Sequence, residues 1–397
     1  MKGYLVLEDG TVFQGEAFGA PGLKPGEVVF ATGMTGYQEA LTDPSYCGQI
    51  LVMTYPLVGN CGINPEDFEA RRPYVRGLVV RELCTDPSHW QATQALHEYL
   101  ADQGIPGLAE IDTRALTRHL RIHGTLRGVI ATPGVGDAPA GAGSDLGAPG
   151  GLVRLGGAGW AVPVPPALAG WFDDLAAMAR GFSLTGVIAQ VTTPQPYTVE
   201  GGGRGPRVAV IDLGVKASLL RCLLDRGCRQ VTVVPATATP AEIRALEPDG
   251  VLISSGPGDP REAGAAIETV RELLQTDLPL FGICLGHQVL ALALGAQTYR
   301  MKFGHRGTNH PVKDLTTGRV YITAQNHGYA VDEASLPRGV VVTHRNLSDG
   351  TVEGLALPGR PVFSVQYHPE AGPGPEDSRY LFDRFIGYMQ EAGLRSA

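Results

Sequence analysis

The feature that most constrains the fold is an alternation of short apolar runs with amphipathic segments through the second half of the chain. The apolar runs include RVAVIDLG, QVTVVP, DGVLISSG and PLFGIC, and the segments between them include KASLLRCLLDRGC and REAGAAIETVRELLQ. Strands that alternate with helices are typical of a parallel, doubly wound sheet. Ligands bind beyond the carboxyl ends of the strands in such sheets. Functional residues are therefore expected where these strands end.

The composition changes along the 397 residues, a length that suggests two or three domains. Residues 1–131 are rich in short strand-like runs separated by turns. Residues 132–170 are dense in Gly, Ala and Pro and carry almost no charge, which predicts an exposed linker without a core of its own. A Gly-rich stretch just before residue 206 marks the clearest boundary. The predicted domains are 1–203, which includes the linker at about 132–170, and 204–397.

Charge and cysteine usage limit the classes of partner. The formal net charge is −8, and the basic residues are scattered, which argues against a nucleic acid or an anionic membrane as partner. No stretch reaches the ~18 apolar residues of a membrane helix, and the N-terminus lacks the order of a secretory signal. The six cysteines show no CxxC spacing. We expect a cytoplasmic protein with reduced thiols.

The string GICLGHQ, residues 282–288, gives the strongest catalytic signal. Cys284 follows an apolar strand and precedes a helix, with glycines two positions before and two positions after it. This is the pattern of a nucleophile elbow with Cys in place of Ser, in which small neighbours permit a tight turn. The helix N-terminus favours a thiolate, because its unpaired N–H groups carry partial positive charge. The alternative is a buried core cysteine beside incidental glycines.

The string HPE, which follows the strand PVFSVQY, supplies a candidate base. Residues two apart on an extended segment point the same way, and Pro369 keeps His368 extended. Glu370 could therefore orient the His368 imidazole, which would accept the proton of Cys284 in a Cys-His-Glu triad. A solvated loop histidine is the alternative for this string by itself. A cysteine elbow in the same domain favours the triad.

The loop SSGPGDP, residues 254–260, could hold an oxyanion on its backbone N–H groups, together with the N–H of Leu285. A plain Gly-Pro turn is the alternative, and no GK[ST] follows that would make it a phosphate loop. The histidines His305, His310 and His327 fit no zinc spacing, and no cysteine or carboxylate cluster joins them in the sequence. We therefore predict no metal site.

Together, the cysteine elbow, the downstream His-x-Glu and the upstream Gly-Pro-Gly loop resemble class I glutamine amidotransferases over residues 206–391. The N-terminal domain of the carbamoyl-phosphate synthetase small-subunit family is resembled by three strings, LEDGTVFQG, GEVVFATGMTGYQEALTDPSY and IDTRALTRHLR. Two strings of the second half, MKFGHRGTNHPV and TAQNHGYAV, resemble the same family. The resemblance implies an α/β fold. It consists of a strand-rich N-terminal α/β domain plus a C-terminal doubly wound, mostly parallel sheet of the class I glutamine amidotransferase type.

The resemblance also implies a reaction. The chain would hydrolyse the glutamine side-chain amide through a cysteine thioester and deliver ammonia to a large subunit. That subunit would make carbamoyl phosphate from bicarbonate and ATP, for arginine and pyrimidine synthesis. ATP and its metal would be used by the partner subunit, with no cofactor in this chain. The matching catalytic positions are Cys284, His368 and Glu370. The matching glutamine-binding positions are Ser45, Gly256, Gly258, Leu285, Gln288, Asn326, Gly328 and Tyr329.

Two other functions remain open from the sequence. One is the amidotransferase component of another pathway, such as anthranilate or guanylate synthesis, against which the N-terminal strings argue. The other is a catalytically silent regulatory or scaffolding subunit. The intact Cys284, His368 and Glu370 argue against the second, because loss of catalysis usually removes the nucleophile first.

Overall fold

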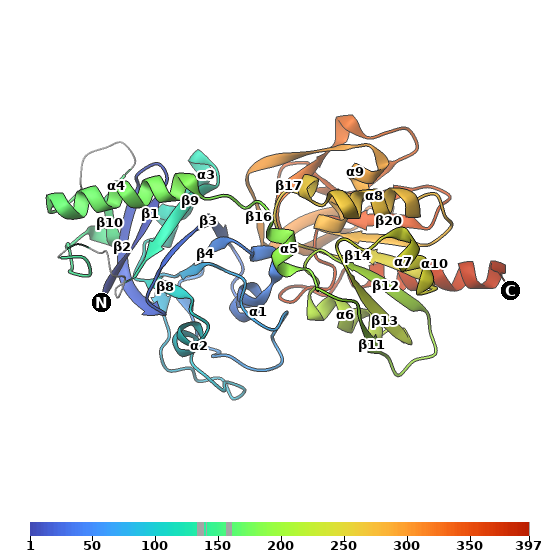
Figure 1. The fold of residues 1–397 in the computed structure, drawn as a ribbon, viewed down its shortest axis with the longest axis horizontal. Coiled ribbons are helices and arrows are strands. Elements are labelled where there is room, and N and C mark those ends of the chain that lie inside the picture. Colours follow the sequence, from blue (N-terminus) through green and yellow to red (C-terminus); the bar gives the residue numbers. More distant parts are fainter. Residues whose placement is uncertain (133–138, 140, 156–160, 397) are drawn as a thin grey trace. The chain divides into compact units, whose positions relative to one another are not determined.

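The computed structural model describes residues 1–132, 139, 141–155 and 161–396. The chain divides into two compact units (Figure 1). The first unit comprises Met1–Thr42 and Tyr46–Leu184, and the second comprises Asp43–Ser45 and Thr185–Ala397. The first unit thus ends before the predicted boundary near residue 203. Strand β11 (Tyr197–Glu200), which precedes that boundary, pairs with a strand of the second unit. Within the described ranges, no helix is long and apolar enough to cross a membrane.

The first unit is built on an eight-stranded sheet whose described strands run in the order β1-β9-β3-β4-β6-β8-β2-β10. Strand β1 also pairs with β2, which closes the ring of strands between them. The strands are β1 (Lys2–Leu7), β2 (Val12–Gly19), β3 (Leu23–Ala31), β4 (Gln49–Met53), β6 (Gly77–Val79), β8 (Pro106–Ala109), β9 (Leu126–Ala131) and β10 (Leu152–Arg154), with a separate pair β5 (Leu57–Val58) and β7 (Glu82–Leu83). The strand-rich character predicted for this region is confirmed.

The helical segments of the first unit are α1 (Tyr37–Thr42), α2 (Leu96–Asp102), α3 (Thr113–His123), α4 (Pro166–Gly181) and the short turn η2 (Pro149–Gly151). Helix α4 packs on β1 and β9 through a buried cluster that includes Tyr4, Phe172 and Leu175. Asp112 caps α3, because its side chain accepts a hydrogen bond from the backbone N–H of Ala115.

The Gly/Ala/Pro-rich segment is tied to the first unit by hydrogen bonds where the structure describes it. Leu146 N donates to Gln14 Oε1 at 3.0 Å, and Gln14 Nε2 donates to the carbonyl of Ser144 at 2.8 Å. Strand β10 then joins the sheet beside β2, with Val153 fully buried. Residues 141–148 are exposed or half-buried, as predicted, and the prediction of an exposed segment fails at β10. Backbone groups and a few apolar side chains suffice there to attach a low-bulk segment to an existing sheet edge. Residues 133–138, 140 and 156–160 of the predicted linker lie outside the described residues.

The second unit is built on a ten-stranded sheet whose described strands run in the order β11-β13-β12-β14-β15-β20-β19-β18-β16-β17. The strands from β13 to β20 in that order pair in parallel, whereas β11 and the strands from β19 to β17 pair antiparallel. These strands are β12 (Arg207–Asp212), β13 (Gln230–Pro235), β14 (Gly250–Ile253), β15 (Leu280–Ile283), β16 (Gln297–Asp314), β17 (Val320–Asp332), β18 (Val341–Asn346), β19 (Val352–Leu357) and β20 (Val362–Val365).

Helices cover both faces of the parallel part, as expected for a doubly wound sheet. They are α5 (Val187–Val191), α6 (Ala217–Leu224), α7 (Pro240–Ala245), α8 (Gly264–Leu273), α9 (Leu285–Leu294) and α10 (Tyr380–Ser396), with short turns at η1 (Pro44–Tyr46), η3 (Pro260–Glu262) and η4 (Glu333–Ser335). Alternate residues of β12 enter opposite cores. Ala209 and Ile211 pack with α7, α8 and α9, whereas Val208 and Val210 pack with α6 and α10. The predicted α/β class is confirmed, and the antiparallel extension β16–β19 is an addition to it.

The order of the strands explains how distant sequence motifs converge. Strands β14, β15 and β20 are hydrogen-bonded neighbours and run in parallel. Their carboxyl ends therefore lie at one edge of the sheet, where Ser254, Cys284 and His368 follow them in the sequence.

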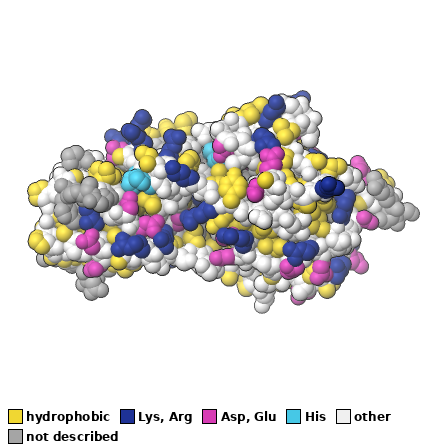
Figure 2. All heavy atoms as spheres, turned by 90° about the horizontal axis from the view of Figure 1, so that it is seen from above, with side chains coloured by type: hydrophobic (Ala, Val, Ile, Leu, Met, Phe, Trp, Pro, Cys, Tyr) yellow, Lys and Arg dark blue, Asp and Glu magenta, His cyan; other side chains and the backbone are white. Residues whose placement is uncertain are grey.

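On the face drawn in Figure 2, Lys and Arg side chains are spread out with Asp and Glu side chains between them.

Candidate active site

Cys284 occupies a strained turn between β15 and α9. Its backbone dihedral angles are φ 53° and ψ −104°, in a region that non-glycine residues rarely adopt. A Cβ on Gly282 would lie 2.6 Å from the carbonyl oxygen of Gly286, and a Cβ on Gly286 would overlap the Ile253 carbonyl. Both glycines are therefore required by packing. Strain of this kind is typical of functional sites, so the elbow supports a nucleophile rather than an incidental core cysteine.

The thiol of Cys284 is buried, with 1% of the residue exposed. Its Sγ donates to the carbonyl oxygen of Asn326 at 3.5 Å. The backbone N–H of Cys284 donates to the Val365 carbonyl at 2.9 Å, which ties the elbow to the neighbouring strand β20. The nucleophile is thus held between the parallel strands and the antiparallel strand β17.

His368, Glu370 and Lys216 form a buried charged chain. His368 Nδ1 lies 2.7 Å from Glu370 Oε1, and Lys216 Nζ lies 3.3 Å from the same oxygen. Lys216 also donates to the carbonyls of Ala371 and Gly372, each at 2.8 Å. Burial by itself would raise the pKa of Glu370, but Lys216 and His368 hold that pKa down at about 2. Glu370 is therefore a carboxylate and orients the imidazole.

The electrostatics of His368 connect it to Cys284. Burial would lower its pKa, but Glu370 and Cys284 outweigh burial and raise the pKa to about 10. Because Nδ1 faces Glu370, Nε2 is the nitrogen left for a reacting group. Nε2 is buried and has no hydrogen-bond partner within the described residues. The structure thus brings Cys284, His368 and Glu370 together as the sequence predicted.

The Gly-Pro-Gly loop lies beside the elbow. A Cβ on Gly256 would overlap the Leu213 carbonyl and approach Leu285 Cδ2 to 2.9 Å, so this position requires glycine. Gly258 has a φ of 88°, which also favours glycine. Ser254 Oγ accepts from the N–H of Leu213 at 2.9 Å and fixes the loop to β12. Gly256 therefore packs against the side chain of Leu285, the residue that follows the nucleophile.

Gln288 lies one helical turn after Cys284 and is 2% exposed. Its Nε2 donates to the Tyr329 carbonyl at 2.8 Å and to Gln366 Oε1 at 3.0 Å. Its amide is therefore held by the protein, and it links α9 to β17. Gly328 and Tyr329 follow Asn326 on that strand, so the structure brings these predicted residues to one side of the elbow.

Ser45 belongs by its contacts to the second unit, as part of the short segment Asp43–Ser45. Its N–H donates to Asp43 Oδ1 at 2.8 Å, and Asp43 Oδ2 accepts from Asn326 Nδ2 at 3.1 Å. The Ser45 Oγ is buried and has no hydrogen-bond partner in the part of the chain that is described. The hydroxyl is thus available to a ligand beside Asn326.

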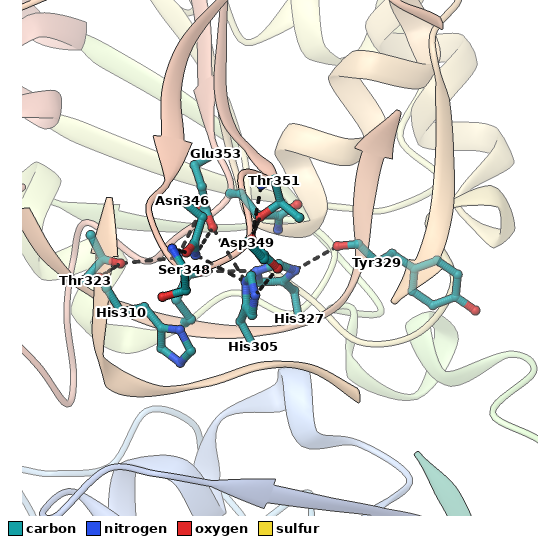
Figure 3. Close-up of polar contacts among 12 residues, drawn as sticks. His305, His310, Thr323, His327, Tyr329, Asn346, Ser348, Asp349, Thr351 and Glu353 are labelled. Atoms are coloured by element: carbon teal, nitrogen blue, oxygen red, sulfur yellow. Dashed lines mark hydrogen bonds and ion pairs between the residues drawn. The ribbon is translucent and has the colours of Figure 1, made fainter. Parts of the chain in front are cut away.

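Sequence reasoning missed three charged residues near the site. The sequence places Lys216 at the start of a predicted helix, although a lysine four residues after a buried strand at the active edge is a usable signal. Asp43 gave no signal of its own. Glu353 joins His305 and His327, with one ligand atom from each of the three residues within 4.8 Å of the others (Figure 3). The argument that no carboxylate accompanies these histidines is therefore wrong, because strand pairing brings together residues far apart in sequence.

Comparison with known proteins agrees with this geometry. Residues 5–130 match the family described as carbamoyl-phosphate synthase small chain, CPSase domain, and residues 209–388 match glutamine amidotransferase class-I. A carbamoyl phosphate synthase small chain from Symbiobacterium thermophilum is 55% identical over 98% of this chain and 99% of its own. A small chain from Bacillus caldolyticus is 50% identical, over 98% and 97%. A pyrimidine-specific small chain from Bacillus subtilis is 49% identical, over 98% and 96%.

Proposed function

This chain belongs to the carbamoyl phosphate synthase small-chain family, and we propose that it hydrolyses the side-chain amide of glutamine with Cys284 as the nucleophile. The observation that carries the proposal is the strained elbow of Cys284 next to the buried pair of His368 and Glu370. A core cysteine needs neither the strain nor the charged partners. A silent scaffolding subunit would have no reason to keep a buried, ionised glutamate.

The first half of the reaction forms a thioester. Cys284 gives its proton to His368 Nε2 before the attack, since the raised pKa of His368 favours the imidazolium. Cys284 Sγ then attacks the side-chain carbonyl carbon of glutamine. The carbonyl oxygen becomes an oxyanion, which the N–H of Leu285 and the Gly256–Gly258 loop would stabilise. His368 then gives its proton to the amide nitrogen, the C–N bond breaks, and ammonia leaves.

The second half regenerates the enzyme. A water molecule attacks the thioester carbon while His368 accepts one of its protons. The C–S bond breaks, glutamate leaves, and the proton on His368 returns to Cys284. Glu370 stays ionised throughout, because its low pKa keeps it a carboxylate that orients and balances the imidazolium. No redox or metal step is needed to balance this sequence.

Glutamine binding is assigned to residues on both sides of the elbow. Ser45 would offer its unpaired hydroxyl, and the edge of β17 would supply Asn326, Gly328 and Tyr329. Gln288 supports this edge through its bond to the Tyr329 carbonyl and lies close to the substrate's polar groups. Gly256, Gly258 and Leu285 would contact the reacting amide.

The ammonia is proposed to pass to a large partner chain. Family membership supports such a partner, which would use bicarbonate, ATP and the metal ion of ATP to make carbamoyl phosphate, with no cofactor in this chain. Pyrimidine and arginine synthesis would use the product, and the pyrimidine-specific name of the Bacillus subtilis relative favours the first. We place the reaction in the cytoplasm, with no nucleic acid or membrane as partner.

A covalent trap tests the nucleophile directly. A diazoketone analogue of glutamine is incubated with the purified chain, and the modified peptide is identified by mass spectrometry. We expect a single adduct on Cys284, no adduct in Cys284→Ser, and protection by glutamine. Cys61 is an exposed cysteine and serves as the internal control for general thiol reactivity. An adduct on Cys61 with none on Cys284 would contradict the proposal and favour a silent subunit.

A further inference from the structure

Three metal-ligating side chains meet in the antiparallel extension, which includes the glutamine edge, the residues Asn326, Gly328 and Tyr329 of β17. His305 lies on β16, His327 on β17 and Glu353 on β19. They are 6%, 5% and 0% exposed, respectively. Each offers one ligand atom, and these atoms lie within 4.8 Å of one another. Figure 3 shows the imidazoles of His305 and His327 next to each other, with Asp349 close by. None of these residues takes part in the reaction described above.

Both imidazoles are oriented by a bond on the nitrogen that faces away from the cluster. His305 Nε2 lies 2.9 Å from Asp349 Oδ2, and His327 Nδ1 lies 2.8 Å from the Tyr329 carbonyl. Each of these nitrogens therefore carries a proton. Histidines that bind metals usually donate their other N–H to a carboxylate or a backbone carbonyl in this way. His305 Nδ1 lies 3.7 Å from Glu353 Oε1, close to the spacing of two ligands on one metal ion. The same oxygen accepts from Asn346 Nδ2 at 2.9 Å, which leaves a lone pair for a metal.

The amide of Gln325 is oriented by contacts with Glu353 and Thr323. Its Nε2 donates to Glu353 Oε2 at 3.0 Å and to Thr323 Oγ1 at 3.2 Å. Thr323 uses its own proton on the His310 carbonyl, so both partners of this Nε2 are acceptors. The orientation of the amide is thus fixed, and Gln325 Oε1 faces His327 Nε2 at 2.9 Å. Since the His327 proton is on Nδ1, two lone pairs face each other.

Two facing lone pairs repel each other, and a metal ion bound by both atoms would remove that repulsion. A second proton on His327 would turn it into a buried imidazolium whose hydrogen-bond partners, within the described residues, are the neutral oxygens of Tyr329 and Gln325. Buried charges are normally paired with an opposite charge. A metal ion bound also by Glu353 would meet that need, because the carboxylate would share its charge.

We propose that His305, His327 and Glu353 bind one divalent first-row transition-metal ion, with Zn²⁺ as the best match. Two imidazole nitrogens and one carboxylate oxygen form a ligand set that suits Zn²⁺, and Gln325 Oε1 is placed to complete a fourth position. The ion would join β16, β17 and β19 and would fix the backbone from Asn326 to Tyr329, where the glutamine edge lies. Its role is structural and positioning rather than chemical.

The test measures metal content in the full-length chain. The protein is loaded with Zn²⁺, its accessible thiols are alkylated, and loose metal is removed by dialysis against a weak chelator. We expect about one Zn²⁺ per chain by elemental mass spectrometry. Glu353→Gln, which keeps the shape of the side chain, should lose this metal. His310→Gln is the matched control, since the His310 ring lies 5.1 Å from that of His305 but is not among the three ligands. It should retain the metal.

Cobalt substitution keeps the proposal testable even if Glu353→Gln does not fold. Co²⁺ in the unmutated chain should give the intense visible absorption of a four-coordinate site, without the near-ultraviolet band of thiolate ligation. An absence of retained metal in the unmutated chain, showing adventitious binding only, would overturn the proposal. So would equal metal in Glu353→Gln and the unmutated chain, or a thiolate band. Proton NMR that shows both His327 ring protons in the metal-free chain, with no change on adding Zn²⁺, would assign the charge to a proton instead.

Discussion

The two halves of the ten-stranded sheet are built differently and supply different parts of the candidate site. The parallel half ends its short, buried strands at one edge, where Cys284 and His368 follow β15 and β20. The antiparallel extension places its functional residues in the middle of long strands, as with Asn326 and Tyr329 on β17. Topology therefore positions the reacting groups, whereas a buried polar network positions the proposed glutamine edge.

This difference predicts different losses when each half is changed. Removing a group at the strand ends of the parallel half should lower the rate of the chemical step. Removing a group from the antiparallel extension should weaken glutamine binding and leave the rate at saturation nearly intact. A result in which both halves affect the same kinetic constant would break the comparison.

The largest effect is expected from the base. His368→Asn removes the proton acceptor for Cys284, and loss of a positioned acid–base group typically costs about 10²–10⁴-fold in rate. Glu370→Gln keeps a hydrogen-bonding oxygen at the same place, so partial glutaminase activity should remain. Glutamate release by each purified variant measures this. Equal and negligible effects of the two substitutions would remove His368 from the mechanism.

A smaller loss of rate is expected from Lys216→Met, together with a loss of stability. Removal of one partner of a buried ion pair typically lowers the free energy of unfolding by about 3–5 kcal/mol, because the other charge stays buried. Glu370 would keep His368 as its partner, so the loss should fall toward the lower value. Chemical denaturation gives the free energy of unfolding, and Lys313→Met, at an exposed position on β16, is the control. A stability equal to that of the unmutated chain would mean that the pair contributes nothing.

The pH dependence of stability should carry the signature of the same triad. The folded-state pKa of His368 is raised to about 10, so its contribution is complete below about 6.5 and fades as the pH rises toward 10. The pKa of Glu370 is lowered to about 2, so its contribution is present above about 4.5 and fades as the pH falls toward 2. Unfolding of the unmutated chain and His368→Asn is compared from pH 6 to 10. A difference that does not shrink with rising pH would contradict this assignment.

The smallest effect is expected in the antiparallel extension. Asn326→Ala removes the amide that donates to Asp43 and borders the proposed glutamine site. Loss of one hydrogen bond at the glutamine edge costs on the order of 1–2 kcal/mol. Because the edge is proposed to bind glutamine, this corresponds to a rise of roughly tenfold in KM for glutamine, with kcat little changed. Asn309→Ala, at an exposed position on β16, should leave both constants unchanged. A fall in kcat with constant KM would place Asn326 in the chemistry instead.

The parallel half was predictable because its signals are local. The string GICLG joins an apolar strand to a helix and holds the cysteine between two glycines. A side chain on Gly282 would clash with Gly286 only four residues away, so part of the need for glycine is local. His368 and Glu370 were predictable for the same reason, since their alignment depends on one extended segment.

The residues that were missed depend on pairing between distant segments. Glu353 reaches His305 only because β19, β18 and β16 are ordered next to one another in the sheet. Lys216 reaches Glu370 across 154 residues of sequence. For the Gly/Ala-rich segment, composition predicted too little attachment to the fold. Its backbone hydrogen bonds to Gln14 cannot be read from its apolar content. No local pattern encodes these contacts.

In the proposed division of labour this chain only generates ammonia, with Cys284 as its nucleophile. Cys284→Ser is nearly isosteric but replaces the thiol with a hydroxyl that hardly ionises at neutral pH. The measurement is carbamoyl phosphate formed by the variant assembled with its large chain, with glutamine in one reaction and ammonium chloride in another. We expect no product with glutamine and an undiminished rate with ammonium. A normal rate with glutamine would contradict the role of Cys284, and no product with ammonium from an assembled complex would contradict the division of labour.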